Sequence, residues 1–448
     1  MEFSHRKVVV VGLGATGKAT ALFLQEKGAQ LTVSEVRGKE ALEPVISTLS
    51  SQGIAVETGG HRLETFLRAE LIVVSPGVPL DSAPLRAAAE RGIEIISEIE
   101  LASRFIHTPL IAVTGTNGKT TTVNLIAEIF RASGKKIFLG GNVGTPLIEY
   151  VRNGEAADYL IIEISSFQLE GIRSFKPFIS VLLNIDYDHL DRYASYEDYI
   201  AAKARIFMNQ SAREYAVLNA DDPEVQKLSS AINATTLYFS CGKEVPQGIS
   251  SRDNYLYYHN GTGTTRFTLA PLYLKGIHNL HNIMAATVVS TLCGCPQQSI
   301  EHTIEHFKGL PHRLELFQET RNIKFYDDSK ATNVGSVVRA LEALEPPLIL
   351  IAGGKDKGGS YRPLRPLIKD KVKVLILLGE AKEKMYQELS SLTHTLLADT
   401  FEEAVKQSLQ HASPGDTVLL SPACSSFDMF KNYEERGETF KTLINTLT

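Results

Sequence analysis

A glycine loop that ends in a lysine is the part of this sequence whose residue types most clearly indicate chemistry. It lies between an apolar run at residues 109–113 and a helix-like segment at 123–131, and it reads Thr114-Gly115-Thr116-Asn117-Gly118-Lys119-Thr120-Thr121. The loop amides can face nucleotide phosphates, the lysine can reach the outer ones, and a threonine hydroxyl can ligate Mg²⁺. The usual motif has a glycine where this chain has Val113. The sequence therefore predicts a variant triphosphate-binding loop rather than a simple capped turn.

A second glycine loop lies near the start of the chain. Gly12, Gly14 and Gly17 follow an apolar strand at residues 7–11 and open a helix, and Glu35 ends the next strand. This arrangement is similar to a dinucleotide-binding fingerprint. Helix N-termini bind many pyrophosphates, however, so a nucleotide-sugar diphosphate fits the same loop. These residues alone do not distinguish a dinucleotide from a nucleotide-sugar diphosphate.

Three further residues could serve a phosphate site. Glu163 ends the apolar strand 159–162, so its carboxylate could hold a metal near the phosphates. His189 lies in the polar run 184–193, where it could bind a second cation or be a hydrogen-bonded structural histidine. Lys203 lies on a helix with small apolar neighbours, and by itself it is typical of a solvated or snorkelling lysine.

The elements that must position these residues alternate between strands and helices along the whole chain. Such alternation predicts parallel sheets covered by helices, with ligands gathered at the carboxyl ends of the strands. Apolar runs predict strands at 7–11, 31–34, 71–74, 110–113, 137–139, 159–164, 179–183, 215–218, 348–352, 372–378, 394–397 and 417–420, and later helices at 300–307, 401–409 and 428–444.

The chain length predicts three domains of this kind. At 448 residues, the chain should form roughly three domains of about 150 residues each. We expect an α/β fold with a Rossmann-like N-terminal domain at 1–97, a central P-loop-type ATP-binding domain at 98–309 and a Rossmann-like C-terminal domain at 310–448.

The composition excludes several classes of protein. A net charge of −5 argues against general nucleic-acid binding. No apolar run approaches the roughly 18 residues of a membrane span, and the first residues lead into a strand rather than a signal-peptide core. The four cysteines form neither a disulfide framework nor a metal-binding spacing, which suits a reducing compartment. We expect a cytoplasmic monomer that binds neither nucleic acid nor membrane.

Together these motifs resemble the ATP-dependent Mur ligases, which share their core with folylpolyglutamate synthetase. The resemblance rests on the loop 114–121, the run 163–170, the run 188–191 and Lys203, and it extends over essentially the whole chain. Within the family, the chain is similar to the members that add D-glutamate to UDP-N-acetylmuramoyl-L-alanine. The segments that carry this closer similarity are 12–17, 188–193 and 421–428.

The resemblance implies that ATP hydrolysis drives amide-bond formation through an acyl phosphate. It also implies two Mg²⁺ sites, formed by Thr120, Glu163, His189 and a Lys203 that is carbamylated by CO₂. Phosphoryl transfer depends mostly on positioning and charge neutralisation, which two metals and a lysine supply.

The resemblance also implies ATP-binding residues, although Asn279 and Asn282, taken alone, would equally suit a helix surface. The implied ATP-binding residues are Gly115, Thr116, Asn117, Gly118, Lys119, Thr120, Thr121, Asn279, Asn282, Arg313 and Asp328.

The resemblance also implies sites for the two other substrates. The UDP-substrate site would comprise Ala15, Thr16, Gly17, Glu35, Arg37, Ser75, Pro76, Gly77 and Asn142. D-Glutamate carries two carboxylates, so its pocket should be cationic and rich in hydroxyls. The implied residues are Lys330, Thr332, Lys357, Ser426 and Tyr433. Tyr433 stands where phenylalanine is usual in the family. Lys357 could instead be an ordinary charged residue of the protein surface.

Two other classes of function stay open, and a third is less favoured. A related ligase with a different acceptor, including folylpolyglutamate synthesis, would not bind a UDP-sugar peptide. A nucleotide-regulated binding protein on the same fold would show no turnover, although Lys119, Glu163, His189 and Lys203 argue against it. A nicotinamide dehydrogenase is the least favoured, because no partner catalytic group follows the first loop.

Overall fold

The structure, a computed structural model, describes residues 3–188, 192–269, 273–274 and 276–448. These residues form two compact units. The first unit contains residues 3–185, 192–269 and 281–304, and the second contains residues 186–188, 273–274, 276–280 and 305–448. Two of the three β-sheets belong to the first unit and the third sheet belongs to the second.

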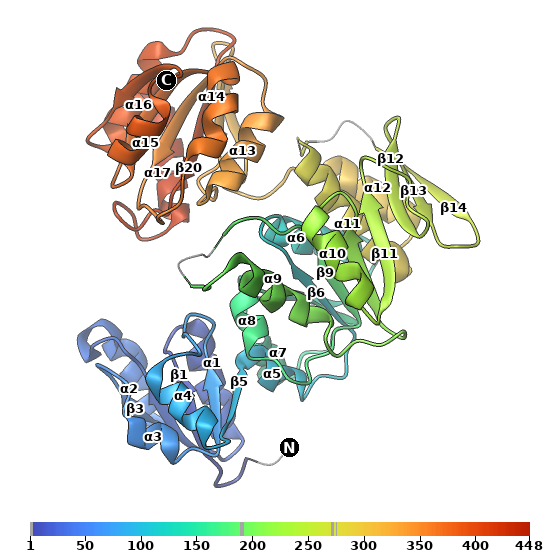
Figure 1. Ribbon diagram of the computed structural model, residues 1–448, viewed down its shortest axis with the longest axis vertical. Helices are drawn as coiled ribbons and strands as arrows, with labels where there is room; N and C mark the ends of the chain where they lie inside the picture. The colour runs from blue at the N-terminus through green and yellow to red at the C-terminus, as the bar shows by residue number, and fades with distance from the viewer. Residues whose placement is uncertain (1–2, 189–191, 270–272, 275) are drawn as a thin grey trace. The chain divides into compact units, whose positions relative to one another are not determined.

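The first sheet has five parallel strands in the order β3-β2-β1-β4-β5, drawn in blue in Figure 1. Successive strand residues point to opposite faces. Val8 and Val10 of β1 therefore pack on the side of α1 and α2, while Val9 and Val11 pack with α3 and α4. The elements are β1 Lys7–Val11, α1 Ala15–Glu26, β2 Gln30–Ser34, α2 Glu43–Ser51, β3 Ala55–Glu57, α3 Leu63–Leu67, β4 Leu71–Val74, α4 Ala83–Glu90 and β5 Glu94–Ser97.

The second sheet has nine strands in the order β14-β13-β12-β11-β10-β9-β6-β8-β7. The strands from β7 to β12 are parallel, and β13 and β14 add an antiparallel edge. The strands are β6 Leu110–Thr114, β7 Ile137–Gly141, β8 Tyr159–Glu163, β9 Ile179–Leu182, β10 Tyr215–Asn219, β11 Thr235–Ser240, β12 Gly248–Arg252, β13 Tyr255–His259 and β14 Thr264–Thr268. The accompanying helices are α5 Glu98–Ser103, α6 Lys119–Ala132, α7 Leu147–Asn153, α8 Ser166–Glu170, α9 Tyr196–Ala204, α10 Pro223–Leu228, α11 Ile277–Leu292 and α12 Gln297–His306.

The third sheet has six strands in the order β15-β16-β20-β17-β18-β19, and only its β15–β16 pair is antiparallel. One face packs with α13, α14 and α15, and the other packs with α16 and α17. The elements are β15 Glu315–Thr320, β16 Ile323–Asp327, α13 Val334–Ala343, β17 Leu348–Gly353, α14 Arg365–Lys371, β18 Val372–Leu378, α15 Lys382–Leu389, β19 His394–Leu397, α16 Phe401–His411, β20 Thr417–Ala423 and α17 Tyr433–Leu447.

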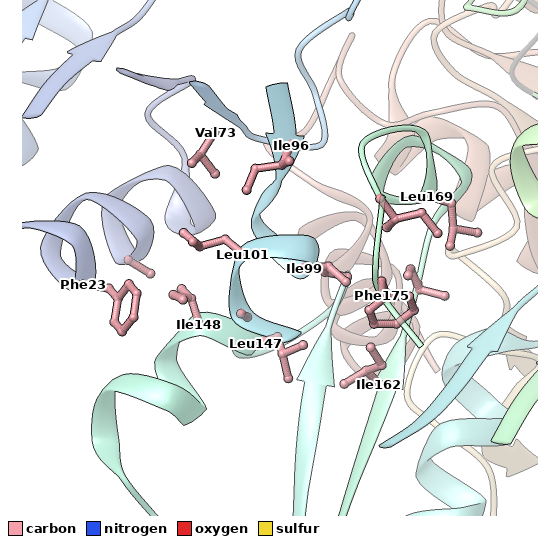
Figure 2. Close-up of a cluster of buried hydrophobic side chains, with 14 of the residues drawn as sticks. Phe23, Val73, Ile96, Ile99, Leu101, Leu147, Ile148, Ile162, Leu169 and Phe175 are labelled. Atoms are coloured by element: carbon pink, nitrogen blue, oxygen red, sulfur yellow. The ribbon is translucent and has the colours of Figure 1, made fainter. Parts of the chain in front are cut away.

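A continuous apolar cluster joins the first sheet to the second. Figure 2 shows Phe23 of α1 close to Leu101 of α5 and Ile148 of α7. The ring of Phe23 also lies 5.2 Å from that of Phe105, edge to face. The carboxylate of Glu98 is buried in the same region, where it accepts a 2.7 Å hydrogen bond from the Ile148 amide. Burial raises the pKa of Glu98 to about 7.

The three sheets agree with the predicted α/β fold class, and each predicted strand is present with bounds that differ by a few residues. The helix predicted to begin at Asp428 was placed too early. It begins at Tyr433, because the Asn432 side chain accepts a 2.8 Å hydrogen bond from the Glu435 amide and caps the helix there. All four cysteines are free. Among the described residues, no helix is long and apolar enough to cross a membrane.

Candidate active site

The lysine loop connects β6 to α6 and has the geometry of an anion-binding turn. Gly118 caps α6 with a φ of +87°, and a Cβ atom there would lie 2.3 Å from Oδ1 of Asn282. A side chain at this position is therefore disfavoured by the left-handed backbone and by the closeness of the Asn282 side chain. Lys119 folds back over the loop, where its Nζ donates to the carbonyls of Gly115 and Thr116, each at 2.8 Å.

Hydrogen bonds from three elements hold this loop from behind. The Asn184 side chain accepts from the Asn117 amide at 2.9 Å and donates to the Asn117 carbonyl at 3.0 Å. The hydroxyl groups of Thr116 and Tyr199 lie 3.0 Å apart. On α11, Asn282 accepts a 3.2 Å hydrogen bond from the buried Thr122 hydroxyl. The loop is thus preorganised by β9, α9 and α11.

Glu163 joins the lysine loop to a second loop. It ends β8 and is buried, and one carboxylate oxygen accepts from the Thr120 hydroxyl at 2.6 Å. The other oxygen accepts from the Asn142 side chain at 2.9 Å. A hydroxyl and a carboxylate beside a phosphate loop form an oxygen-donor set that fits Mg²⁺. The structure thus brings together three residues predicted from separate strands.

Lys203 is buried, so its reading as a solvated or snorkelling lysine was wrong. Its Nζ donates a 2.9 Å hydrogen bond to the Gly115 carbonyl, which Lys119 also contacts, and lies 4.6 Å from the centroid of the Tyr199 ring. Two lysine side chains therefore meet at one carbonyl of the phosphate loop. His189, the remaining predicted metal ligand, lies outside the described residues.

The first glycine loop is closed by a buried carboxylate. Glu35 accepts a 2.6 Å hydrogen bond from the Leu13 amide, and the Arg37 guanidinium binds both of its oxygens at 3.0–3.1 Å. Burial acts to raise the pKa of Glu35, but the hydrogen bonds from Arg37 and from the Leu13 amide outweigh it and hold the pKa at about 2. Both oxygens are thus engaged within the protein, which argues against the ribose contact of a dinucleotide site.

Other predicted residues of the first sheet lie at the same strand ends. Ala15, Thr16 and Gly17 form the first turn of α1, and a Cβ atom on Gly17 would lie 1.9 Å from the Gly12 carbonyl oxygen. The Ser75 hydroxyl, which follows β4, donates to the same carbonyl at 3.2 Å. Pro76 and Gly77 continue from Ser75 in a turn, and Gly77 is exposed.

In the second unit, Asn279 and Arg313 line a cavity of about 930 Å³ together with Lys308, Leu314 and Tyr326. Asn279 and Asn282 are both buried, so their reading as helix-surface residues was wrong.

Asp328 is buried behind the loop that follows β16. It accepts hydrogen bonds from the Ser421 hydroxyl at 2.7 Å and from the Leu314 amide at 3.0 Å. Burial, helped by the nearby charge of Asp327, raises the pKa of Asp328 to about 7.

The residues predicted to bind D-glutamate lie on loops of the third sheet. The Nζ of Lys330 lies 3.6 Å from the centroid of the Tyr433 ring, a cation–π contact. Thr332 and the buried Ser426 follow β16 and β20, which are neighbouring parallel strands. Lys357 is exposed, so its reading as a surface charge remains open.

Arg436, which the sequence analysis missed, connects these two loops. It is 1% exposed and donates to the Ser329 hydroxyl at 2.9 Å, to the Ser329 carbonyl at 2.8 Å and to the Cys424 carbonyl at 3.2 Å. Burial lowers the pKa of Arg436 to about 10. The helical spacing of Arg436 with Phe440 and Ile444 gave a signal, because it puts an arginine on the apolar face of the helix.

Comparison with known proteins shows similarity along nearly the whole chain. Three family models match: the Mur ligase MurD-like N-terminal domain at residues 6–97, the Mur ligase middle domain at 113–290 and the Mur ligase glutamate ligase domain at 312–424.

Curated relatives similar to this chain over its full length carry the name UDP-N-acetylmuramoylalanine–D-glutamate ligase. The protein from Geotalea uraniireducens is 52% identical over 447 residues, covering 100% of this chain and 99% of its own length. The protein from Citrifermentans bemidjiense is 50% identical over 444 residues, covering 99% and 98%. Among solved structures, a pseudomurein peptide ligase type C from Methanothermus fervidus shares the fold, with a TM-score of 0.63 at 21% identity, covering 99% of this chain and 100% of that chain.

Proposed function

The chain belongs to the Mur ligase family, and we propose that it joins the amino group of D-glutamate to the alanyl carboxyl group of UDP-N-acetylmuramoyl-L-alanine, with ATP converted to ADP and phosphate. This reaction builds a peptidoglycan precursor. The observation that carries the proposal is that Lys119 and Thr120 lie in one phosphate loop, where the Thr120 hydroxyl contacts Glu163. The chain is also about half identical over its full length to relatives named for this reaction.

The proposed reaction has two steps. The alanyl carboxylate attacks the γ-phosphoryl group of ATP, which gives an acyl phosphate and ADP. The amine of D-glutamate then attacks the acyl carbon, and phosphate leaves from the tetrahedral intermediate. Lys119 and the amides of residues 115–121 neutralise and orient the phosphates, which is the main requirement of phosphoryl transfer.

Thr120 and Glu163 would hold a first Mg²⁺ through oxygen ligands, and His189 and a carbamylated Lys203 would hold a second. The metal ions would neutralise the charge that develops on the transferring phosphoryl group. Two lysines at the Gly115 carbonyl support the carbamylation proposal. Conversion of one ammonium group to a carbamate would replace a repelling pair of charges with an attracting pair.

We assign the other predicted residues to the UDP-substrate, ATP and D-glutamate sites implied by the sequence. The loop 12–17, Glu35, Arg37, residues 75–77 and Asn142 would bind the UDP substrate, with Glu35 shaping the loop through its internal hydrogen bonds. The cavity lined by Asn279 and Arg313 would take part of ATP, and Asp328 would support its wall through the Leu314 amide. Lys330, Thr332, Lys357, Ser426 and Tyr433 would form the D-glutamate pocket.

We also propose domain boundaries at 97/98 and 309/310, since β5 ends at Ser97 and β15 begins at Glu315. The four free thiols support a cytoplasmic location. We also propose that the chain acts as a monomer.

The decisive measurement is ATP-dependent phosphate release with UDP-N-acetylmuramoyl-L-alanine and each of D-glutamate, L-glutamate, diaminopimelate and L-lysine. We expect release only with D-glutamate, together with a product heavier by one glutamyl unit. Release with a different amino acid would keep the ligase chemistry and reject the assigned acceptor. A folded protein that binds ATP and Mg²⁺ but releases no phosphate with any acceptor would contradict the proposed reaction.

A further inference from the structure

A carboxylate, a thiol and an imidazole come together at the strand ends of the second sheet. The ligand atoms of Asp221, Cys241 and His281 all lie within 4.8 Å of one another, and Oδ2 of Asp221 lies 3.0 Å from Nε2 of His281. We propose that these three side chains form a binding site for a thiophilic divalent cation of the Zn²⁺ class.

The site is assembled from three elements. Asp221 and Cys241 follow β10 and β11, which are neighbouring parallel strands, so their side chains emerge at the same edge of the sheet. His281 lies on α11, and Met284 lies three residues later on the same helix face. The sulfur atoms of Cys241 and Met284 are 3.5 Å apart. The sequence alone does not indicate this site, because the three ligands are spread over residues 221–281.

The donor atoms suit zinc better than magnesium. Thiolate, imidazole and carboxylate are the ligands that bind Zn²⁺ at about 2.0–2.3 Å, and in a tetrahedral site they lie about 3.3–3.8 Å from one another. The aspartate–histidine pair, at 3.0 Å, is already near that separation, and the Cys241 sulfur lies within 4.8 Å of both ligand atoms. The side chains of His281 and Asp221 are 17% and 22% exposed, which gives an ion a route from solvent.

The carboxylate is also held in place by neighbours. The Ser240 hydroxyl donates to Oδ1 of Asp221 at 2.5 Å, and the Cys241 amide donates to Oδ2 at 2.6 Å. Such outer hydrogen bonds orient metal ligands and strengthen their binding. A fourth coordination position would be filled by water or by the Met284 thioether, which lies against the thiol.

A second cluster of similar composition shows what distinguishes this one. His312, Glu315 and Asp327 also lie within 4.8 Å. There, however, Nζ of Lys441 lies 2.7 Å from Glu315 and 3.7 Å from Asp327, so an ammonium group already takes the place of a cation. Within the described part of the chain, no lysine or arginine pairs with Asp221. The first cluster therefore keeps its negative charge available for an ion.

The test is a titration of the full chain, stripped of metal with a chelator, with Co²⁺ followed by competition with Zn²⁺. We expect a thiolate-to-Co²⁺ charge-transfer absorption that Zn²⁺ displaces, because Zn²⁺ binds such sites more tightly than Co²⁺ does. Thr120 and Glu163 offer only oxygen atoms, so a cation bound by them would not produce this band.

Cys241→Ser should remove the band and weaken Zn²⁺ binding more than about 100-fold, since loss of even an outer-shell partner costs about 10–100-fold. His281→Gln, which can still donate a hydrogen bond to Asp221, should weaken Zn²⁺ binding without loss of the fold. Cys295→Ser is the matched control, because it removes another thiol and should leave the band unchanged. A folded wild-type chain without the band, or a band that survives Cys241→Ser and disappears in Cys295→Ser, would overturn the proposal.

Discussion

The two glycine loops of the first unit have similar sequences and different geometry. In each, a lysine follows the last glycine, as Gly17-Lys18 and Gly118-Lys119. The first loop even has the glycine spacing usual for a triphosphate loop, with Gly12 five residues before Gly17. In the structure, α1 begins at Ala15 and carries Lys18 as its fourth residue, whereas α6 begins at Lys119 itself.

This difference in helix start determines what each loop can hold. Lys119 emerges at the helix N-terminus and folds back over the loop carbonyls, so its ammonium group lies where phosphates would be bound. Lys18 lies beyond the first three residues of α1, and the first loop is instead closed by Glu35 and Arg37. The position at which the helix begins thus distinguishes the proposed triphosphate loop from the proposed diphosphate loop more clearly than glycine spacing does.

The largest expected effect comes from Lys119→Ala. Loss of the ammonium group over the phosphates should lower kcat about 10³-fold or more, since single charged groups at such sites contribute this much. Phosphate release measures the change, and calorimetry with the UDP substrate measures whether the first loop is intact. If UDP-substrate binding disappears as well, the two loops do not act separately and the comparison fails.

A pair of glycine substitutions should separate the two loops. Gly118→Ala adds a Cβ atom 2.3 Å from Asn282 at a left-handed backbone position, and Gly17→Ala adds one 1.9 Å from the Gly12 carbonyl. Strain of this kind costs about 1–3 kcal/mol. We expect about tenfold or greater loss of ATP affinity in the first variant and a similar loss of UDP-substrate affinity in the second. Equal loss of both ligands in either variant would contradict this assignment.

Glu35→Gln tests the carboxylate that closes the first loop. The pKa of Glu35 is depressed to about 2 in the fold, so its stabilisation is fully present above the unfolded pKa of about 4.5 and is lost as pH falls through 2. We expect the variant to unfold about 2 kcal/mol more easily at pH 7, and the difference to shrink at pH 4. Urea unfolding measures both values. The exposed Glu43→Gln is the control, and an equal loss there would indicate a general charge effect.

The smallest effect should come from Lys18→Ala. Because this lysine is not directed over the loop by the start of a helix, its removal should change kcat and ATP affinity by less than about twofold, as is usual for surface substitutions. Comparison of this variant with Lys119→Ala shows whether the position of the lysine relative to the helix start, or the glycine–lysine motif alone, determines the effect on activity. A loss that approaches that of Lys119→Ala would mean that glycine spacing, rather than helix start, identifies the triphosphate loop.

Much of the fold could be predicted because buried parallel strands are continuous apolar runs. All five residues of β6 are buried, and the strand was found almost to its last residue. The strands β3, β5 and β11 to β16 were not predicted. In β13 every second side chain is partly exposed, and in β15 all of them are, so neither strand is a continuous buried run.

The candidate site was predictable where its residues follow strands and unpredictable where partners are distant. Thr120, Glu163 and Asn142 meet because they follow neighbouring parallel strands. Arg436 contacts Ser329 across 107 residues of sequence, and no local pattern encodes such a pair. Glu35 was predicted only as a substrate contact, and its internal hydrogen bonds to Leu13 and Arg37 depend on tertiary structure.

The apolar cluster around Phe23, Leu101 and Ile148 has a consequence for engineering by module exchange. A break after Ser97 would separate α1 from α5 and α7 and expose the faces that now bury one another (Figure 2). Burial of one such side chain is worth about 1.5–3 kcal/mol, so an isolated first module would lose much of its margin against unfolding. Chimeras that exchange the nucleotide-sugar specificity of two such ligases should therefore carry α5 and α7 with the first sheet, and their natural crossover points lie inside the second sheet rather than at its border.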